Sequence, residues 1–227
     1  MVETMSKKAL RVRQRLFESL EFREEVAERL CLDRSLVLNS IDALLDAELI
    51  PCALSTNARS LAADGASILM AIGSRQSTAA SIARVAARLG SMDLQGEIAG
   101  NEPARGVADI FPRTTSISFG TDVAELLLNL WKAAHGISTS GFTGVAVSML
   151  WNDMQGSILF GVIEQSVGRR KRIYATDPFR IPSGVTNEWH FVQLPTVGGI
   201  KYEPRSILRF GALLDASVAD TAARLRV

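Results

Sequence analysis

The chain is poor in the residues on which metal sites and disulfide scaffolds depend. Its 227 residues include only two cysteines and two histidines. Cys31 and Cys52 do not suggest a disulfide framework, and this usage is typical of a protein in a reducing cytoplasm. Because the sequence has no CxxC pair, no HExxH helix and no second histidine near either one, we expect no metal site.

Long apolar runs and a strong net charge are also missing. The longest apolar stretches, around residues 67–72 and 145–151, suit a protein core and are too short to cross a membrane. The N-terminus is polar and basic without the apolar segment of a signal peptide, so we expect a cytoplasmic protein with no membrane contact. The formal net charge is +1, which gives no bulk electrostatic argument for a nucleic-acid partner.

Sequence motifs for catalysis are absent as well. The glycines between residues 96 and 106 form neither a GxGxxG nor a GxxxxGK[ST] pattern, so no nucleotide cofactor is expected. Ser183 does not lie in a GxSxG elbow. His135 is more typical of a helix C-terminus, where a cation is favoured, and His190 of a sheet residue. We therefore expect no cofactor and no enzymatic activity.

Hydrophobic periodicity predicts an α+β protein whose helices come first. Helical patterns occupy residues 7–20, 57–72, 79–89 and 123–134, with Ser77 or Thr78 as one cap and Asp122 as another. Strand patterns occupy residues 114–119, 144–151, 157–165, 172–176 and 189–194. The sequence thus divides into a helix-turn-helix region (1–60), a helical extension (61–95), a linker or long loop (96–112) and an α+β domain (113–227), in which a final segment, 203–225, is mostly helix-compatible.

Residues 24–50 are the most informative stretch, because they predict two helices joined by a tight turn. Ala27 supplies a small residue where the helices would cross, and Val37 is placed to lock the second helix onto the first. Asp33 is a good N-cap for that second helix. Such a unit projects one helix away from its support, as DNA-binding proteins require.

This stretch resembles the winged helix-turn-helix domain of bacterial and phage regulators. The resemblance rests on Leu32-Asp33-Arg34-Ser35-Leu36-Val37, then Ile41, Leu44 and Ala47-Glu48-Leu49-Ile50, and it covers residues 7 to about 60. Cys31 and Glu48 stand where that family usually has glycine, and no clear β-hairpin wing follows Ile50. A looser similarity in organisation, to prophage-type regulators, implies phage or prophage encoding.

The resemblance implies contact with double-stranded DNA. Arg34, Ser35 and Asn39 lie at outward positions of the second helix, and arginine and asparagine are the types that read guanine and adenine edges. Five basic residues without an acid lie between residues 7 and 15, and Arg59 is the one basic residue of the segment after Ile50. The full set of expected DNA contacts is Lys7, Lys8, Arg11, Arg13, Arg34, Ser35, Asn39, Arg59, Arg169, Arg170, Lys171 and Arg172, the last four being placed in a turn.

Three functions remain open from the sequence. The favoured one is a sequence-specific transcriptional regulator acting as a homodimer, with the α+β domain oligomerising or binding an effector or a protein partner. The first alternative is an interaction protein whose helix-turn-helix holds another protein, which two leucines, Leu36 and Leu38, near the outward face would suit. The second alternative is a phage packaging or replication component.

Overall fold

The computed structural model describes residues 20–50, 58–98, 118–134, 145–152, 158–165, 170–176 and 200–202. Within these residues, four helices precede the first strand: α2 (Leu20–Leu30), α3 (Arg34–Asp46), α4 (Ala58–Ser74) and α5 (Ala79–Gly90). They are followed by β1 (Asp93–Ile98), α6 (Phe119–Ala134), β2 (Val145–Asn152), β3 (Ile158–Gln165), β4 (Arg170–Ala175) and β5 (Ile200–Tyr202). The fold is α+β, as the sequence predicts.

The strands form one antiparallel sheet in the order β1-β4-β3-β2-β5. Strands β2, β3 and β4 are neighbours in both sequence and space. The two edges come from elsewhere in the chain: β1 follows α5 and pairs with β4, whereas β5 pairs with β2. A register shift between Leu94 and Gly96 interrupts the β1–β4 ladder.

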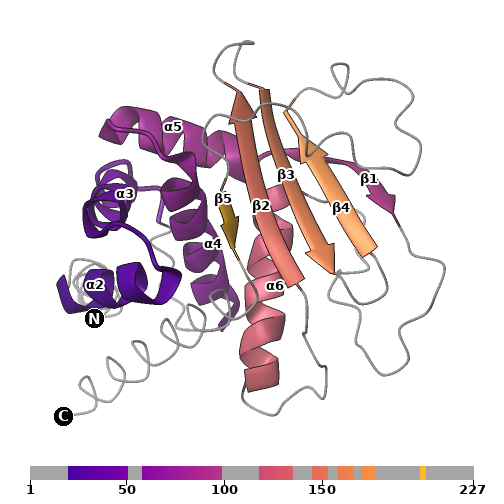
Figure 1. Cartoon of the computed structure of the whole chain (residues 1–227), viewed down its shortest axis with the longest axis horizontal. Helices are drawn as coiled ribbons and strands as arrows, with labels where there is room; N and C mark the ends of the chain where they lie inside the picture. Colours follow the sequence, from indigo (N-terminus) through magenta and orange to yellow (C-terminus); the bar gives the residue numbers. More distant parts are fainter. Residues whose placement is uncertain are drawn as a thin grey trace, which may run out of the picture.

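The helices gather on one side of the sheet, with α6 nearest to it and α2 and α3 farthest away (Figure 1). Helix α4 packs on α6 and α5, and α3 packs on both α4 and α5. A single cluster of buried side chains extends from α2, where Val26 is fully buried, through α4 to Val145 and Tyr174 of the sheet. In β2, the alternating apolar residues Val145, Val147 and Met149 are buried and form part of this cluster.

Most of the predicted elements are confirmed within the described residues. The helices predicted at 57–72 and 79–89 correspond to α4 and α5, and Thr78 caps α5 by accepting a hydrogen bond from the Ser81 amide. The strands predicted at 144–151 and 157–165 correspond to β2 and β3. The predicted elements at 7–20, 189–194 and 203–225 lie mostly or entirely outside the described residues, as do His135, His190, Ser183 and Cys52.

Three local predictions are wrong. Strand β1 occupies residues 93–98, partly within the stretch predicted to be a loop, because its polar backbone is paired by a distant strand, β4. Helix α6 begins at Phe119, earlier than predicted, so Phe119 belongs to a helix and not to a strand. The third wrong prediction is Asp122 as the cap of this helix. The hydroxyl of Ser118, the residue before α6, accepts a hydrogen bond from the Thr121 amide, so the Asp122 carboxylate is available for another role.

None of the helices in the described residues combines the length and apolar character that a membrane crossing requires.

Candidate nucleic-acid interface

The turn between α2 and α3 is built from backbone hydrogen bonds that close the end of α2. Cys31 has a left-handed backbone, with φ 53°. The Leu32 amide donates to the Ala27 carbonyl (2.9 Å) and the Cys31 amide to the Glu28 carbonyl (3.1 Å). This pair of bonds is the Schellman arrangement that ends many helices. The same arrangement ends α3 at Glu48, also with φ 53°, where Leu49 donates to Leu44. Both positions at which the resembled family usually has glycine therefore have the conformation that favours glycine.

Asp33 begins α3 as its N-cap, as the sequence predicts. Its carboxylate accepts hydrogen bonds from the amides of Ser35 (2.8 Å) and Leu36 (3.2 Å) and from the Ser35 hydroxyl. The Ser35 hydroxyl bond, followed by the two amide bonds, lowers the pKa of Asp33 below its ordinary value. The carboxylate is therefore ionised near neutral pH and complements the positive end of the helix dipole.

One face of α3 is buried and fixes its position. Val37, Ile41, Ala43 and Leu44 are buried where α3 packs on α2, α4 and α5. Ala27 of α2 is buried as predicted for the helix crossing. The two helices are therefore held as a unit by close apolar packing, which leaves a second face of α3 for other contacts.

The second face of α3 exposes Arg34, Ser35, Asn39, Asp42 and Asp46. Arg34 forms an ion pair with Glu24 of α2, although its side chain keeps 57% exposure. Asp42 pairs with the largely buried Arg23 of α2 at 2.7 Å. The outward face is thus tied to α2 by two charge pairs, and its balance is acidic, because Asp33, Asp42 and Asp46 outnumber Arg34.

The other predicted contact residues do not gather around α3 in the described part of the chain. Lys7, Lys8, Arg11, Arg13 and Arg169 lie outside the described residues. Arg59, the second residue of α4, pairs with Glu125 of α6 at 3.4 Å. The backbones of Arg170, Lys171 and Arg172 belong to β4, so the turn predicted for the basic cluster is wrong. These residues pair with β1 and β3 and thereby continue the sheet.

Arg172 is turned inward, which corrects its prediction as a phosphate contact. Its Nη1 donates to Asp122 Oδ2 of α6 at 2.8 Å, and its Nε donates to Glu97 Oε2 of β1 at 3.2 Å. The Tyr174 hydroxyl donates to the same Asp122 oxygen. With Arg172 6% and Asp122 1% exposed, this buried polar network joins α6 to two strands.

The electrostatics of the buried network raise the pKa values of Arg172 and Tyr174. Burial lowers the pKa of the Arg172 guanidinium, but the hydrogen bond and charge of Asp122 outweigh it, so the net shift is upward. Burial, reinforced by the hydrogen bond to Asp122, raises the pKa of Tyr174 above its ordinary range. A permanently protonated tyrosine and a permanently charged arginine are suited to holding Asp122 in place, and they offer no proton for transfer near neutral pH.

The sequence did not identify this network because its members look ordinary one by one. Asp122 precedes an apolar helical pattern and resembles a cap, while Glu97 lies in a stretch rich in glycine. The residues that meet are separated by 50 to 75 positions. The sequence holds one signal for the network: Arg172 and Tyr174 are two positions apart in a predicted strand and therefore lie on the same face of it.

Within the described residues, no group of three or more histidine, cysteine, aspartate or glutamate side chains is placed to hold a metal ion. A scan against protein-family models found no match, and searches of curated proteins and of solved structures found no similar chain either.

Proposed function

We propose that this chain binds double-stranded DNA in a sequence-specific manner and controls transcription as a homodimer, with α3 entering the major groove. The observation that supports this most is the placement of α3. It is capped by Asp33, packs on α2, buries Val37 and Ile41, and exposes Ser35 and Asn39 on its other side. A helix held in this way presents side chains beyond its support, as reading a major groove requires.

In this proposal Asn39 and Arg34 read base edges. Asparagine pairs with adenine through two hydrogen bonds, and arginine pairs with guanine in the same manner. The ion pair of Arg34 with Glu24 is between exposed side chains. Exposed pairs contribute about 0–1 kcal/mol, so Arg34 can exchange Glu24 for a guanine at small cost.

Phosphate contacts have to come from outside α3 because its exposed face is acidic. Phosphate neutralisation supplies much of the affinity of DNA-binding proteins and makes that affinity depend on salt. The proposal assigns these contacts to the basic segment that contains Lys7, Lys8, Arg11 and Arg13. The two tasks are then divided: α3 selects the sequence, and the basic segment supplies affinity.

The test begins with selection of binding sites from a pool of random double-stranded DNA by the full chain. The enriched site is then bound by wild type, Asn39→Ala, Arg34→Ala and a control, Arg84→Ala, which changes an exposed arginine of α5. We expect Asn39→Ala and Arg34→Ala each to lose about 1–3 kcal/mol of specific binding, and the control to lose none. If no sequence is enriched at low salt, or if both α3 variants bind the site as tightly as wild type, the proposal is wrong.

The basic segment is tested by its salt dependence. Changing Lys7, Lys8, Arg11 and Arg13 to glutamine should weaken binding to all DNA sequences about equally and flatten the decline of affinity with salt. Sedimentation of the same variant reports the dimer. A wild-type salt slope, with loss of dimer or of folding stability instead, would assign the segment to protein contacts.

The acidic exposed face of α3 supports a second candidate, in which the unit binds a protein. Asp42 and Asp46 would repel DNA phosphates but suit a basic protein surface. In this case DNA binding is absent even at low salt. A failure to bind DNA in the selection experiment would therefore exclude the DNA-binding function and leave protein binding. The variant Asp46→Lys distinguishes the two functions further, because it should strengthen DNA binding and weaken binding to a basic protein.

A further inference from the structure

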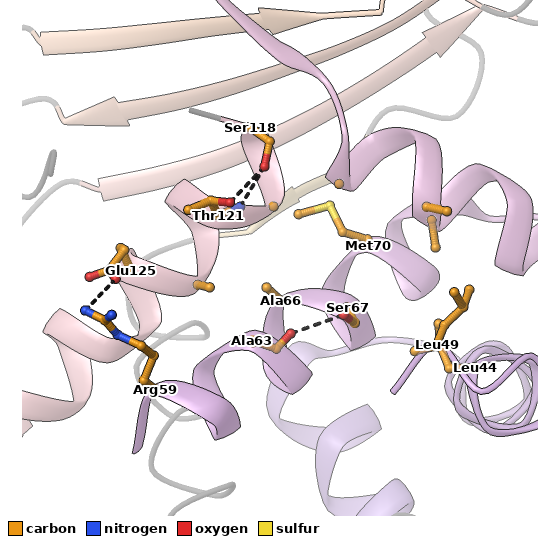
Figure 2. A pocket seen from close by; sticks show the side chains of 15 residues that line it. Leu44, Leu49, Arg59, Ala63, Ala66, Ser67, Met70, Ser118, Thr121 and Glu125 are labelled. Atoms are coloured by element: carbon orange, nitrogen blue, oxygen red, sulfur yellow. Dashed lines mark hydrogen bonds and ion pairs between the residues drawn. The ribbon is translucent and has the colours of Figure 1, made fainter. Parts of the chain in front are cut away.

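An open groove lies among α3, α4, α5 and α6, away from the exposed face of α3, and its volume is about 470 Å³ (Figure 2). This volume lies in the range of about 300–1,000 Å³ that is typical of small-molecule sites. Neither the DNA-binding proposal nor the buried network around Asp122 uses this space.

The floor of the groove is apolar and well packed. Leu44 of α3, Ala66 and Met70 of α4 and Ala86 of α5 line it, and each is almost completely buried. The space above them exists because the neighbouring positions carry small residues, including Ala63 and Ala124. A ligand here would contact mainly hydrocarbon surface, which favours an apolar molecule over a sugar or a nucleotide.

Small residues also bring the helices themselves together at one end of the groove. A Cβ atom at Gly120 of α6 would lie 3.0 Å from both the Cα atom and the carbonyl oxygen of Gly90 of α5. Both glycines line the groove. The walls are therefore set by backbone contact between α5 and α6, which makes the groove a formed feature of the fold.

Apart from Ser67, whose hydroxyl donates to the Ala63 carbonyl, the polar side chains of the groove lie along α6 and at the start of α4. Arg59 points across to Glu125, with 3.4 Å between its Nη2 and the Glu125 Oε1, and its side chain is 79% exposed (Figure 2). One turn earlier, the hydroxyls of Ser118 and Thr121 lie 2.9 Å apart at the beginning of α6. The Arg59 guanidinium is the group among these side chains that favours a carboxylate, because the positive end of the α6 dipole lies more than one turn away from Glu125.

We propose that this groove binds a small organic acid whose apolar body contacts Ala63 and Ala124 and whose carboxylate pairs with Arg59. Arginine offers five N–H donors in a planar fork that matches a carboxylate in bidentate geometry. Glu125 contacts Arg59 at a single long distance, so a ligand carboxylate competes with it and replaces a weak pair by a stronger one. The inference is independent of DNA binding, because every residue it uses lies outside the proposed reading face.

The test uses two matched probes and no DNA. A fluorinated naphthoate and the corresponding neutral fluorinated naphthalenemethanol are titrated into the full chain and followed by fluorine NMR. We expect saturable binding of one naphthoate per chain with a dissociation constant in the millimolar range or below, and weaker binding of the alcohol. Failure of the naphthoate to saturate, or equal affinity of both probes, would overturn the proposal.

Variants then locate the site. Arg59→Gln should weaken naphthoate binding about tenfold, since it removes a charge-assisted pair, while the affinity of the alcohol stays within about twofold. Glu125→Gln should strengthen naphthoate binding because it removes the competing carboxylate. Arg84→Gln changes an exposed arginine of the same helix layer outside the groove and should affect neither probe.

Filling the groove provides the second line of evidence. Ala63→Leu, and independently Ala87→Leu at an exposed position of α5, should each weaken both probes severalfold, with melting temperatures measured to verify that the variants are folded. The Ala87 variant keeps the test decisive if leucine at position 63 disturbs packing. Unchanged affinities in Arg59→Gln and in a folded groove-filling variant would show that the probes bind elsewhere and that the proposed site is wrong.

Discussion

Helices α2 and α3 are joined mainly by apolar packing, whereas α6 is joined to the sheet by a buried pair of charges. Between α2 and α3 the charge pairs reach the surface, because both side chains of Arg34–Glu24 are exposed and Arg23 is paired with an exposed Asp42, and buried apolar residues hold the helices together. Between α6 and the sheet the charges are inside, where Arg172 meets Asp122. Surface pairs are screened and contribute little, whereas a buried pair becomes costly once one partner is lost.

The two regions also differ in how far apart in sequence their partners are. The turn after α2, the Asp33 cap and the pair Arg34–Glu24 all join residues within one short stretch. The contacts of β4 with α6 and β1, made by Arg172 and Tyr174, join residues 50 to 75 positions apart. Local chemistry therefore defines the first region, and the assembled fold defines the second.

The largest expected effect comes from removing one member of the buried pair. Asp122→Leu leaves the Arg172 charge in the interior and should cost about 3–5 kcal/mol of unfolding free energy, measured by urea denaturation. The matched change in the other region, Glu24→Gln, should cost less than about 1 kcal/mol. The double variant Asp122→Leu with Arg172→Met should be more stable than Asp122→Leu alone. Equal losses in the two regions would remove the contrast between them.

The second largest loss of stability is expected from a steric clash between β3 and α6. A Cβ atom at Gly161 of β3 would lie 2.7 Å from the Phe119 ring and 2.8 Å from the Met92 methyl group, so α6 can approach β3 only at a glycine. Gly161→Ala should cost about 1–3 kcal/mol through overpacking. Gly96→Ala in β1 is the control, since a Cβ atom there meets nothing within 4 Å. If both variants melt at the same temperature, α6 does not pack as closely as described.

The third prediction concerns alkaline pH. Tyr174, with its pKa raised from 10.0, stays protonated in the folded chain at a pH where the unfolded chain has released the proton. The buried Tyr174 hydroxyl contributes fully to the free energy of unfolding below about pH 10. This contribution is lost as the pH rises above that value, because deprotonation then favours the unfolded state. Unfolding midpoints from about pH 8 to about pH 11 should fall more steeply for wild type than for Tyr174→Phe. Parallel profiles would show that the hydroxyl is not buried in the network.

The smallest effect should come from the two left-handed residues that end α2 and α3. A residue with a side chain loses about 1–2 kcal/mol of folding stability in this conformation. Glycine avoids that loss, but its greater freedom in the unfolded chain lowers stability by about 0.5–1 kcal/mol. Cys31→Gly and Glu48→Gly should therefore each gain up to about 1 kcal/mol in thermal melts. Glu28→Gly, inside α2, is the control and should lose about that amount. A loss in all three would contradict the left-handed conformation at residues 31 and 48.

The sequence was sufficient wherever the deciding interaction is local. Asp33 was identified as a cap, and Thr78 as one of two candidates with Ser77, because a cap bonds to amides two or three residues further along. Val37 and Ile41 were identified as buried because helical spacing places them on one face. Asp122 was misassigned because Ser118 takes the capping role and the partners of Asp122 are brought to it only by β4. Strand β1 was missed for the same reason, since a short polar segment becomes a strand only when another strand is there to pair with it.

The placement of β1 has a consequence for the order in which the molecule can be assembled during synthesis. Strand β1 ends at Ile98, and its partner β4 begins only at Arg170. At about 5–20 residues per second, β4 follows β1 by roughly 4–15 s. Among the described residues, the start of α6 also contacts this region, since the Phe119 amide donates to the Met92 carbonyl at 2.9 Å and Ser118 bridges to Asp93. The residue at which β1 begins therefore has a described partner that is synthesised before β4.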